Sequence, residues 1–227
     1  MNYPFIRSCQ FDGPVLDGIY QAAFGYKEDG LFVEAGASNG EDHSNTWGLS
    51  RIGWRGIYIE PVASLASACQ ANHQHNPLIK TIHAAAAAHD GAGTVWFIPE
   101  WGTSTLNEQA AATISPHPLA QPCRMIKLDT VLAAEGWPAR YDLLVIDVDF
   151  GEIEVLRGCN LQRWRPTLAI VETHEKTMDT GIRHPFSGAV LDFANAFFAA
   201  AGYQKVYADY INTVFRCSPP SLVNRIC

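Results

Sequence analysis

The chain has 227 residues, of which 48% are hydrophobic and 17% charged, a composition typical of a globular protein and not of a disordered one. This length is enough for one α/β domain with a full hydrophobic core. With 16 Lys and Arg against 23 Asp and Glu, the formal net charge is −7, so we expect a surface that repels phosphate backbones and no nucleic-acid partner.

The N-terminal residues and the cysteines together indicate a cytoplasmic protein. Arg7, Asp12 and Asp17 interrupt the apolar residues at the start of the chain, which argues against a secretory signal. No apolar run approaches the roughly 20 residues that span a bilayer, so we expect no membrane partner. The six cysteines, at positions 9, 69, 123, 159, 217 and 227, contain no Cys-x-x-Cys pair. We therefore predict neither a cysteine zinc site nor a disulfide framework.

Short apolar runs recur along the chain and predict the strands of a sheet. They span residues 31–33, 56–59, 78–82, 94–97, 141–146 and 167–171. Because the runs are continuous and bounded by polar residues, we expect central parallel strands that are buried on both faces. Helix-like segments lie between them, at residues 44–51, 62–72, 130–135 and 151–156. This alternation predicts a doubly wound α/β sheet.

The last part of the chain has a different pattern. Residues 188–201 form a predicted helix rich in Phe and Ala, which ends at Gly202. Two short strand-like runs follow, at residues 203–207 and 211–216, with a tight turn between them. We predict that they form a closing antiparallel hairpin.

The alanine run at residues 84–88 has two interpretations. Alanine has the highest helix propensity, so the run could be the core of a helix. However, it follows a strand-like run and stops at His89-Asp90-Gly91, which is a turn signal. In the second interpretation, small side chains at the end of a strand let a flat ligand approach the backbone.

The first chemical signal is a glycine-containing loop that follows the first predicted strand, with the sequence FVEAGASNG. Ligands of open α/β sheets bind at the carboxyl ends of the strands, and glycines allow a close backbone approach. Ala37 stands where a dinucleotide fingerprint needs its second glycine, and Glu34 adds negative charge beside it. Glu34, Gly36 and Gly40 instead suit a nucleoside that carries a cationic amino-acid group. Glu60 ends the next strand, where a carboxylate can bind both hydroxyls of a ribose.

These segments resemble the FkbM-type methyltransferases, a branch of the class I S-adenosylmethionine-dependent enzymes. The resemblance covers residues 31–172 and is carried by FVEAGASNG, Ser44-Asn45-Thr46, GWRGIYIEP, HAAAAAHDG, IKLDTVL, YDLLVIDVD, EVLRG and the Pro166 to Glu172 spacing. It implies a Rossmann-like, doubly wound, mostly parallel seven-stranded sheet with helices on both faces and a C-terminal antiparallel hairpin. Residues 31–227 would be the methyltransferase domain, and residues 1–30 a segment that packs on the core or shapes the acceptor pocket.

The resemblance also implies a set of S-adenosylmethionine-binding residues. The methionine part would lie against Glu34, Gly36, Ala37, Asn39 and Gly40, with Ser44 and Asn45 near its carboxylate. Glu60 would hold the ribose hydroxyls with Pro61 beside it, and His83 and Ala84 would flank the adenine. Asp147 would lie next to the reactive methyl group.

Acidic and imidazole side chains that could take a proton from an acceptor follow the fourth and fifth predicted strands. They are Asp147, Asp149, Glu152, Glu172, His174 and Glu175. In extended segments, Asp147 and Asp149 share a face, as do Glu172 and His174. We expect Asp147, Asp149 or His174 to be the catalytic base. The set Asp147, Asp149, Glu172 and His174 could also hold magnesium or calcium, but a metal site is not favoured, because Asp149 and Glu152 are equally well placed to cap a helix start.

One departure from the family concerns the acceptor side. The family usually has Asp-Val-Glu-Gly after the fourth strand, whereas this chain has Asp147-Val148-Asp149-Phe150. Replacing the glycine by Phe150 restricts the backbone and places a large ring at the mouth of the site. We expect residues 101–122 and 176–185 to help shape the acceptor pocket, with 101–106 a mobile segment near the cofactor. His73 and His75 follow a predicted helix and are expected to be solvated.

The function that these observations favour is transfer of a methyl group from S-adenosylmethionine to a hydroxyl of an uncharged small molecule or sugar. N-methylation of a peptide or amide nitrogen is the nearest alternative, since the same cofactor half serves both reactions. A NAD-dependent oxidoreductase and a cofactor-binding protein without catalysis are the other two. Assembly into a homo-oligomer is left open.

Overall fold

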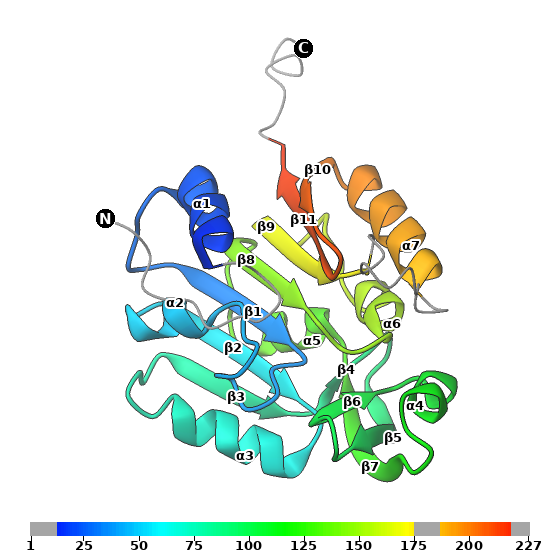
Figure 1. The fold of residues 1–227 in the computed structure, drawn as a ribbon. Coiled ribbons are helices and arrows are strands. Elements are labelled where there is room, and N and C mark those ends of the chain that lie inside the picture. The colour runs from blue at the N-terminus through cyan, green and yellow to red at the C-terminus, as the bar shows by residue number, and fades with distance from the viewer. Residues whose placement is uncertain (1–12, 175–186, 219–227) are drawn as a thin grey trace.

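Seven of the strands form one sheet. In the computed structural model, which describes residues 13–174 and 187–218, they are β1 (Leu31–Ala35), β2 (Arg55–Glu60), β3 (Ile79–His83), β8 (Arg140–Ile146), β9 (Arg165–Glu172), β10 (Tyr203–Ala208) and β11 (Asn212–Cys217). Their order is β10-β11-β9-β8-β1-β2-β3 (Figure 1). Pairing from β3 to β9 is parallel, and β11 pairs antiparallel with β9 and with β10. The predicted mostly parallel sheet and its C-terminal hairpin are confirmed.

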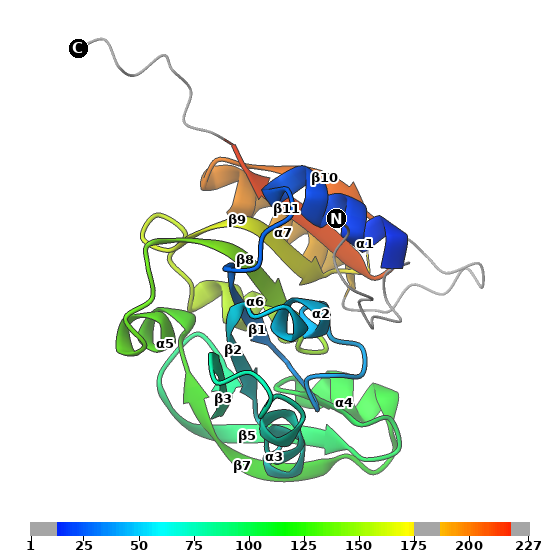
Figure 2. The same ribbon diagram turned by 90° about the vertical axis from the view of Figure 1, so that its left-hand side faces the viewer.

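Helices cover both faces of this sheet. On one face lie α1 (Gly13–Phe24), α2 (Trp47–Arg51) and α3 (Ala63–Asn72), and on the other α5 (Leu128–Ala134), α6 (Glu152–Arg157) and α7 (Ser187–Ala200). Side chains alternate along β8. Leu143 and Val145 therefore pack in the hydrophobic core under α1, α2 and α3, while Leu144 and Ile146 pack in the core under α5, α6 and α7. In Figure 2, α1 and α2 lie on one side of the sheet and α5 on the other.

A second sheet was not predicted. It contains β4 (Ala85–Ala86), β5 (Gly91–Ile98), β6 (Thr103–Thr105) and β7 (Leu119–Ile126) in the order β4-β7-β5-β6, with α4 (Glu108–Ile114) between β6 and β7. The prediction that residues 94–97 form a central parallel strand is wrong, because β5 pairs antiparallel with β6 and β7. Within β5 only Val95 and Ile98 are buried. When the exposed residues of a strand are also apolar, its sequence has the same continuous apolar run as a central strand, even though only one side is covered.

The alanine run at residues 84–88 contains the first strand of this second sheet, β4. Ala85 and Ala86 pair in parallel with Met125 and Ile126, so the run continues a strand and is not a helix. The strand before it, β3, lies at the edge of the large sheet and is only half-buried, which corrects the expectation that residues 78–82 are central.

The N-terminal helix packs against the core. Leu16 and Tyr20 of α1 are fully buried, and the Tyr20 hydroxyl donates a hydrogen bond of 2.7 Å to the backbone oxygen of Asn45. Residues 1–12, Glu175 and the predicted acceptor loop at 176–185 lie outside the described residues. Within residues 13–174 and 187–218, no helix is long and apolar enough to cross a membrane.

Candidate active site

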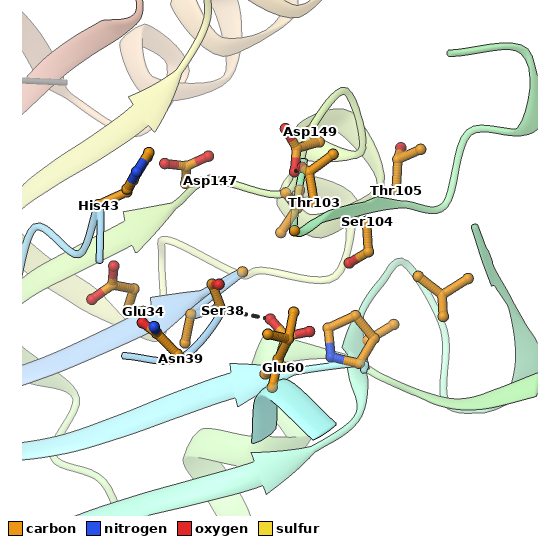
Figure 3. A pocket seen from close by; sticks show the side chains of 18 of the residues that line it. Glu34, Ser38, Asn39, His43, Glu60, Thr103, Ser104, Thr105, Asp147 and Asp149 are labelled. Atoms are coloured by element: carbon orange, nitrogen blue, oxygen red, sulfur yellow. Dashed lines mark hydrogen bonds between the residues drawn. The ribbon is translucent and has the colours of Figure 1, made fainter. Parts of the chain in front are cut away.

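A cavity of about 390 Å³ opens at the carboxyl ends of β1, β2 and β8 (Figure 3). The loop after β1 contributes Gly36–Asn39 and Asp42–Ser44, and the end of β2 contributes Glu60 and Pro61. Asp147–Asp149 follow β8, and residues 101–106 form the wall beside them. The cavity therefore lies where open α/β sheets bind their ligands.

The two glycines of the loop after β1 have no space for a side chain. Gly36 has a φ of +84°, and an added Cβ would lie 1.6 Å from the backbone oxygen of Asp147. Gly40 has a φ of +72°, and its Cβ would lie 2.6 Å from both Cys69 Sγ and His73 Nε2. Both positions thus require glycine, for the conformation and for the close packing of the loop. Ala37 adopts a negative φ and hydrogen-bonds through its N–H to the oxygen of Ile59 at 3.2 Å.

His73 is buried beneath this loop, so the expectation that it is solvated is wrong. It is 2% exposed, stacks on Tyr58 with 4.5 Å between ring centroids, and lies 2.8 Å from the oxygen of Gly40 through Nε2. Burial lowers its pKa to about 4, so the ring is neutral and Nε2 donates to the Gly40 carbonyl. His75 is exposed as predicted. The last turn of α3 therefore supports the glycine loop, a tertiary contact that helical periodicity does not reveal.

Glu34 is held by the Ser44-Asn45-Thr46 segment. Its carboxylate accepts hydrogen bonds from Ser44 Oγ at 3.0 Å, from the Asn45 N–H at 3.4 Å and from the Thr46 hydroxyl. Burial nevertheless raises its pKa to about 7. Ser44 lines the cavity, whereas Asn45 is fully buried behind it. The motif thus fixes Glu34, and of its first two residues only Ser44 reaches the cavity.

Glu60 lies on the cavity surface at the end of β2. Its carboxylate accepts hydrogen bonds of 2.8 Å from the N–H groups of Ser38 and Val62, the first of which is drawn in Figure 3. Burial raises its pKa to about 7. A carboxylate has about four acceptor positions, so Glu60 can accept two further hydrogen bonds from a ligand.

The two residues expected around an adenine, His83 and Ala84, do not line the cavity. His83 is exposed and hydrogen-bonds to the oxygen of Pro61 at 3.0 Å, and Ala84 is fully buried. The next two residues, Ala85 and Ala86, line the cavity instead. Gly40 likewise supports the loop from below and does not line the cavity, whereas Gly36, Ala37, Asn39 and Pro61 do.

Two acids that follow β8 reach the cavity, and two further acids are buried behind it. Asp147 and Asp149 line the cavity. Asp149 accepts hydrogen bonds from the Thr103 hydroxyl and the Ser104 N–H, while burial, and secondarily the charge of Asp147, raise its pKa. Burial likewise raises the pKa of Glu152 and of Glu172. Glu152 accepts from the N–H groups of residues 148 and 150 at 3.2 Å, so it fixes the loop between β8 and α6, and the helix start itself has no side-chain cap.

His174 does not line the cavity. Its Nε2 lies 3.2 Å from a Glu172 oxygen, and its side chain also hydrogen-bonds to the backbone of Tyr210. Burial lowers the pKa of His174 and raises that of Glu172, so both side chains favour their neutral forms. His174 could take a proton from an acceptor only if the Glu172 contact were broken.

Phe150 retains the backbone conformation that suits a glycine. Asp149 and Phe150 have consecutive positive φ values of 51° and 74°, and the Phe150 ring stacks on His174 with 5.6 Å between centroids. The predicted restriction of the backbone by Phe150 appears here as two consecutive residues in the left-handed region. Phe150 covers His174 but is not one of the lining residues of the cavity.

The charge of the cavity suits a cation. Among the described residues that line it, five are acidic (Glu34, Asp42, Glu60, Asp147 and Asp149) and none is Lys or Arg. Within residues 13–174 and 187–218, no three His, Cys, Asp or Glu side chains are grouped as metal ligands, so the set Asp147, Asp149, Glu172 and His174 is not arranged as a metal site. The close-packed glycine loop, the free acceptor positions of Glu60 and these carboxylates fit a nucleoside with a cationic amino-acid group.

Several residues that line the cavity were not predicted from the sequence. Asp42, His43, Leu65 and Val95 line the cavity. Their spacing carries no motif, because Leu65 reaches the cavity from α3 and Val95 from the second sheet, while Asp42 and His43 follow the glycine motif in the loop after β1. The wall at residues 101–106 was predicted to lie near the cofactor as a mobile segment; it does line the cavity, and it contains β6.

Comparison with known proteins identifies a family. The family described as "Methyltransferase FkbM domain" matches residues 34–205. No curated protein sequence matches the chain. Among solved structures, an O-methyltransferase from Bacillus cereus in complex with SAH has 14% identity and a TM-score of 0.48, covering 88% of this chain and 77% of its own. A precorrin-6y C5,15-methyltransferase from Geobacter metallireducens has 12% identity and a TM-score of 0.48, covering 93% and 91%.

Proposed function

Because the chain belongs to the FkbM family of S-adenosylmethionine-dependent methyltransferases, we propose that it methylates a hydroxyl group of an uncharged small molecule or sugar. The observation that carries the finer part of this proposal is the charge of the cavity. Its described lining has five carboxyl groups and neither Lys nor Arg, so an anionic acceptor would meet no counter-charge. The family assignment also favours methyl transfer over hydride transfer to a nicotinamide.

We assign the donor to the glycine-loop side of the cavity. Gly36, Ala37, Asn39 and Ser44 would contact its amino-acid part, and Gly40 would support them through His73. Glu60 and Pro61 would hold the ribose, and the segment from His83 to Ala86 would flank the adenine. Ala85 and Ala86, which line the cavity, are the members of that segment with direct access.

Bound S-adenosylmethionine supplies a methyl group already activated by its positively charged sulfur. The protein must therefore align the acceptor and remove the hydroxyl proton. Asp149 is our first choice for the proton acceptor, because it lines the cavity and its raised pKa makes it a stronger base than an ordinary carboxylate. Asp147 lies beside it and would keep the approaching oxygen in place. His174 would act behind them, by fixing Phe150 and Glu172.

Transfer of labelled methyl groups to a panel of neutral alcohols, amines and amides tests this proposal. We expect Asp149→Asn to lower kcat by about 10²–10⁴-fold with the KM for S-adenosylmethionine little changed. Asp192→Asn, an exposed acid on α7, is the matched control and should have no effect. A chelator should not reduce activity, and His174→Ala should act mainly on stability. Full activity of Asp149→Asn would remove Asp149 from the mechanism.

Methyl transfer to nitrogen is the second candidate. The same carboxyl groups would attract a cationic amine and could accept a proton from nitrogen. Labelling of amines or amides, with no labelling of alcohols, would replace the first proposal by this one. Binding of S-adenosylmethionine without turnover of any acceptor would instead support a binding protein.

A further inference from the structure

The cavity wall at residues 101–106 has the composition of a recognition surface. Trp101 is 73% exposed, the highest exposure among the large hydrophobic side chains of the described residues, yet it lines the cavity. Next to it, Thr103 and Ser104 line the same wall with half-buried hydroxyl side chains, whereas Thr105 is buried. An exposed indole beside a row of hydroxyls offers both an apolar face and hydrogen-bonding groups, and no charge.

This wall is held in a fixed position. Ile98, Phe97 and Trp96 of β5 pair with the residues of β6 in antiparallel register. At its far end, the Thr105 hydroxyl accepts a hydrogen bond of 3.0 Å from the N–H of Asn107, which in turn caps α4. Such support would let Trp101 meet a ligand without ordering a loop first.

The wall also lies on the acceptor side of the cavity. The Thr103 hydroxyl and the Ser104 N–H both donate to Asp149, the proposed proton acceptor. Figure 3 shows Thr103 and Asp149 together, across the cavity from Ser38 and Glu60. A ligand on this wall would therefore lie beside the proposed base and opposite the ribose-binding acid.

We propose that Trp101 and the hydroxyls of Thr103 and Ser104 form the acceptor subsite, and that it takes an uncharged hydroxylated ring. The indole would stack on the carbon–hydrogen face of the ring, and the wall hydroxyls would pair with its hydroxyl groups. This inference rests on the proposed function, since it places the acceptor of that reaction. It makes Trp101 a specificity-determining residue.

The first experiment measures binding alone. The protein is saturated with S-adenosylhomocysteine, and indole fluorescence is followed while methyl glycosides of neutral hexoses, matched uronates or the acyclic polyol sorbitol are added. We expect a neutral glycoside to change the fluorescence of the wild type and not of Trp101→Phe. Absence of that difference overturns the subsite, and an equal response to sorbitol overturns its selectivity for rings. Failure of the protein to bind S-adenosylhomocysteine would instead contradict the proposed function.

The second experiment separates acceptor binding from donor binding. We expect Trp101→Ala to raise the acceptor KM about tenfold, because the stacking contact and the apolar area that it buries are both lost. Trp101→Phe should restore most of that loss. Leu119→Ala removes a side chain that is 49% exposed and outside the cavity, and it should change nothing. A rise in the KM for S-adenosylmethionine would show that Trp101 covers the donor and would overturn the proposal.

Discussion

Because the backbone at Phe150 is strained, we predict that glycine is more stabilising than alanine at this position, the reverse of the usual order. Phe150 has a φ of +74°, a left-handed conformation that costs an L-residue about 1–2 kcal/mol and glycine almost nothing. Its ring recovers part of this by stacking on His174, which contributes about 0.5–1.5 kcal/mol. Phe150→Ala loses the stacking and keeps the strain, whereas Phe150→Gly loses the stacking and relieves the strain.

Glycine also increases the entropy of the unfolded chain, which costs about 0.5–1 kcal/mol relative to alanine. We therefore expect Phe150→Ala to reduce the free energy of unfolding by about 0.5–1.5 kcal/mol, and Phe150→Gly to be more stable than Phe150→Ala by about 0.5–1 kcal/mol. Urea unfolding followed by circular dichroism measures both differences.

The control is the pair Asp192→Gly and Asp192→Ala, for which we expect the alanine variant to be the more stable. Asp192 is exposed within α7, where glycine is about 1 kcal/mol less favourable than alanine. If glycine were also the less stable variant at position 150, the left-handed strain at Phe150 would be refuted. Equal stability of the wild type and Phe150→Ala would refute the contribution of the ring.

Three further predictions concern the donor side. Gly36→Ala should abolish donor binding and destabilise the fold, because its Cβ would lie 1.6 Å from the Asp147 oxygen. The control is Gly136→Ala, at a φ of +60° with nothing within 4 Å of the added Cβ. It should reduce the free energy of unfolding by only about 1–2 kcal/mol, measured by thermal unfolding. His73→Phe keeps the ring but loses the hydrogen bond to the loop, so calorimetry should show about tenfold weaker donor binding, whereas unchanged affinity would remove His73 from the site. Burial raises the pKa of Glu60 to about 7, so its contribution to stability is present below its ordinary pKa of 4.5 and is lost as the pH rises through 7. A cationic donor favours the charged form, so its affinity should increase from pH 6 to pH 8 with release of protons, and a flat profile would contradict this.

The parts of the site that depend on local backbone chemistry could be predicted from the sequence. Gly36 and Glu60 each follow an apolar strand, and that placement alone puts them at the carboxyl edge of a parallel sheet. The mostly parallel sheet and the closing hairpin were predicted from the alternation of apolar runs and from the family resemblance, whereas the order of the strands comes from the structure. The structure adds that Ser44-Asn45-Thr46 serves mainly to hold Glu34.

The parts of the site that depend on tertiary packing could not be predicted from the sequence. His73 has the sequence context of a solvated helix end, yet it is buried because the glycine loop folds over it. Strand β7 contains Pro122, which lacks an N–H and usually argues against a strand, so its pairing with β5 was not visible in the sequence. Without β7 the second sheet could not be predicted, and without that sheet Trp101 had no defined position.

The most direct test of the account is calorimetric titration of the full chain with S-adenosylmethionine, repeated with Glu60→Ala and with the control Glu135→Ala, which removes a carboxylate that pairs with Lys80 outside the cavity. We predict that the wild type and Glu135→Ala bind the donor equally. Glu60→Ala should bind at least about 100-fold more weakly, because two hydrogen bonds to a charged acceptor contribute about 1.5–3 kcal/mol each. Absence of binding to the wild type, or equal binding to Glu60→Ala, would contradict the account.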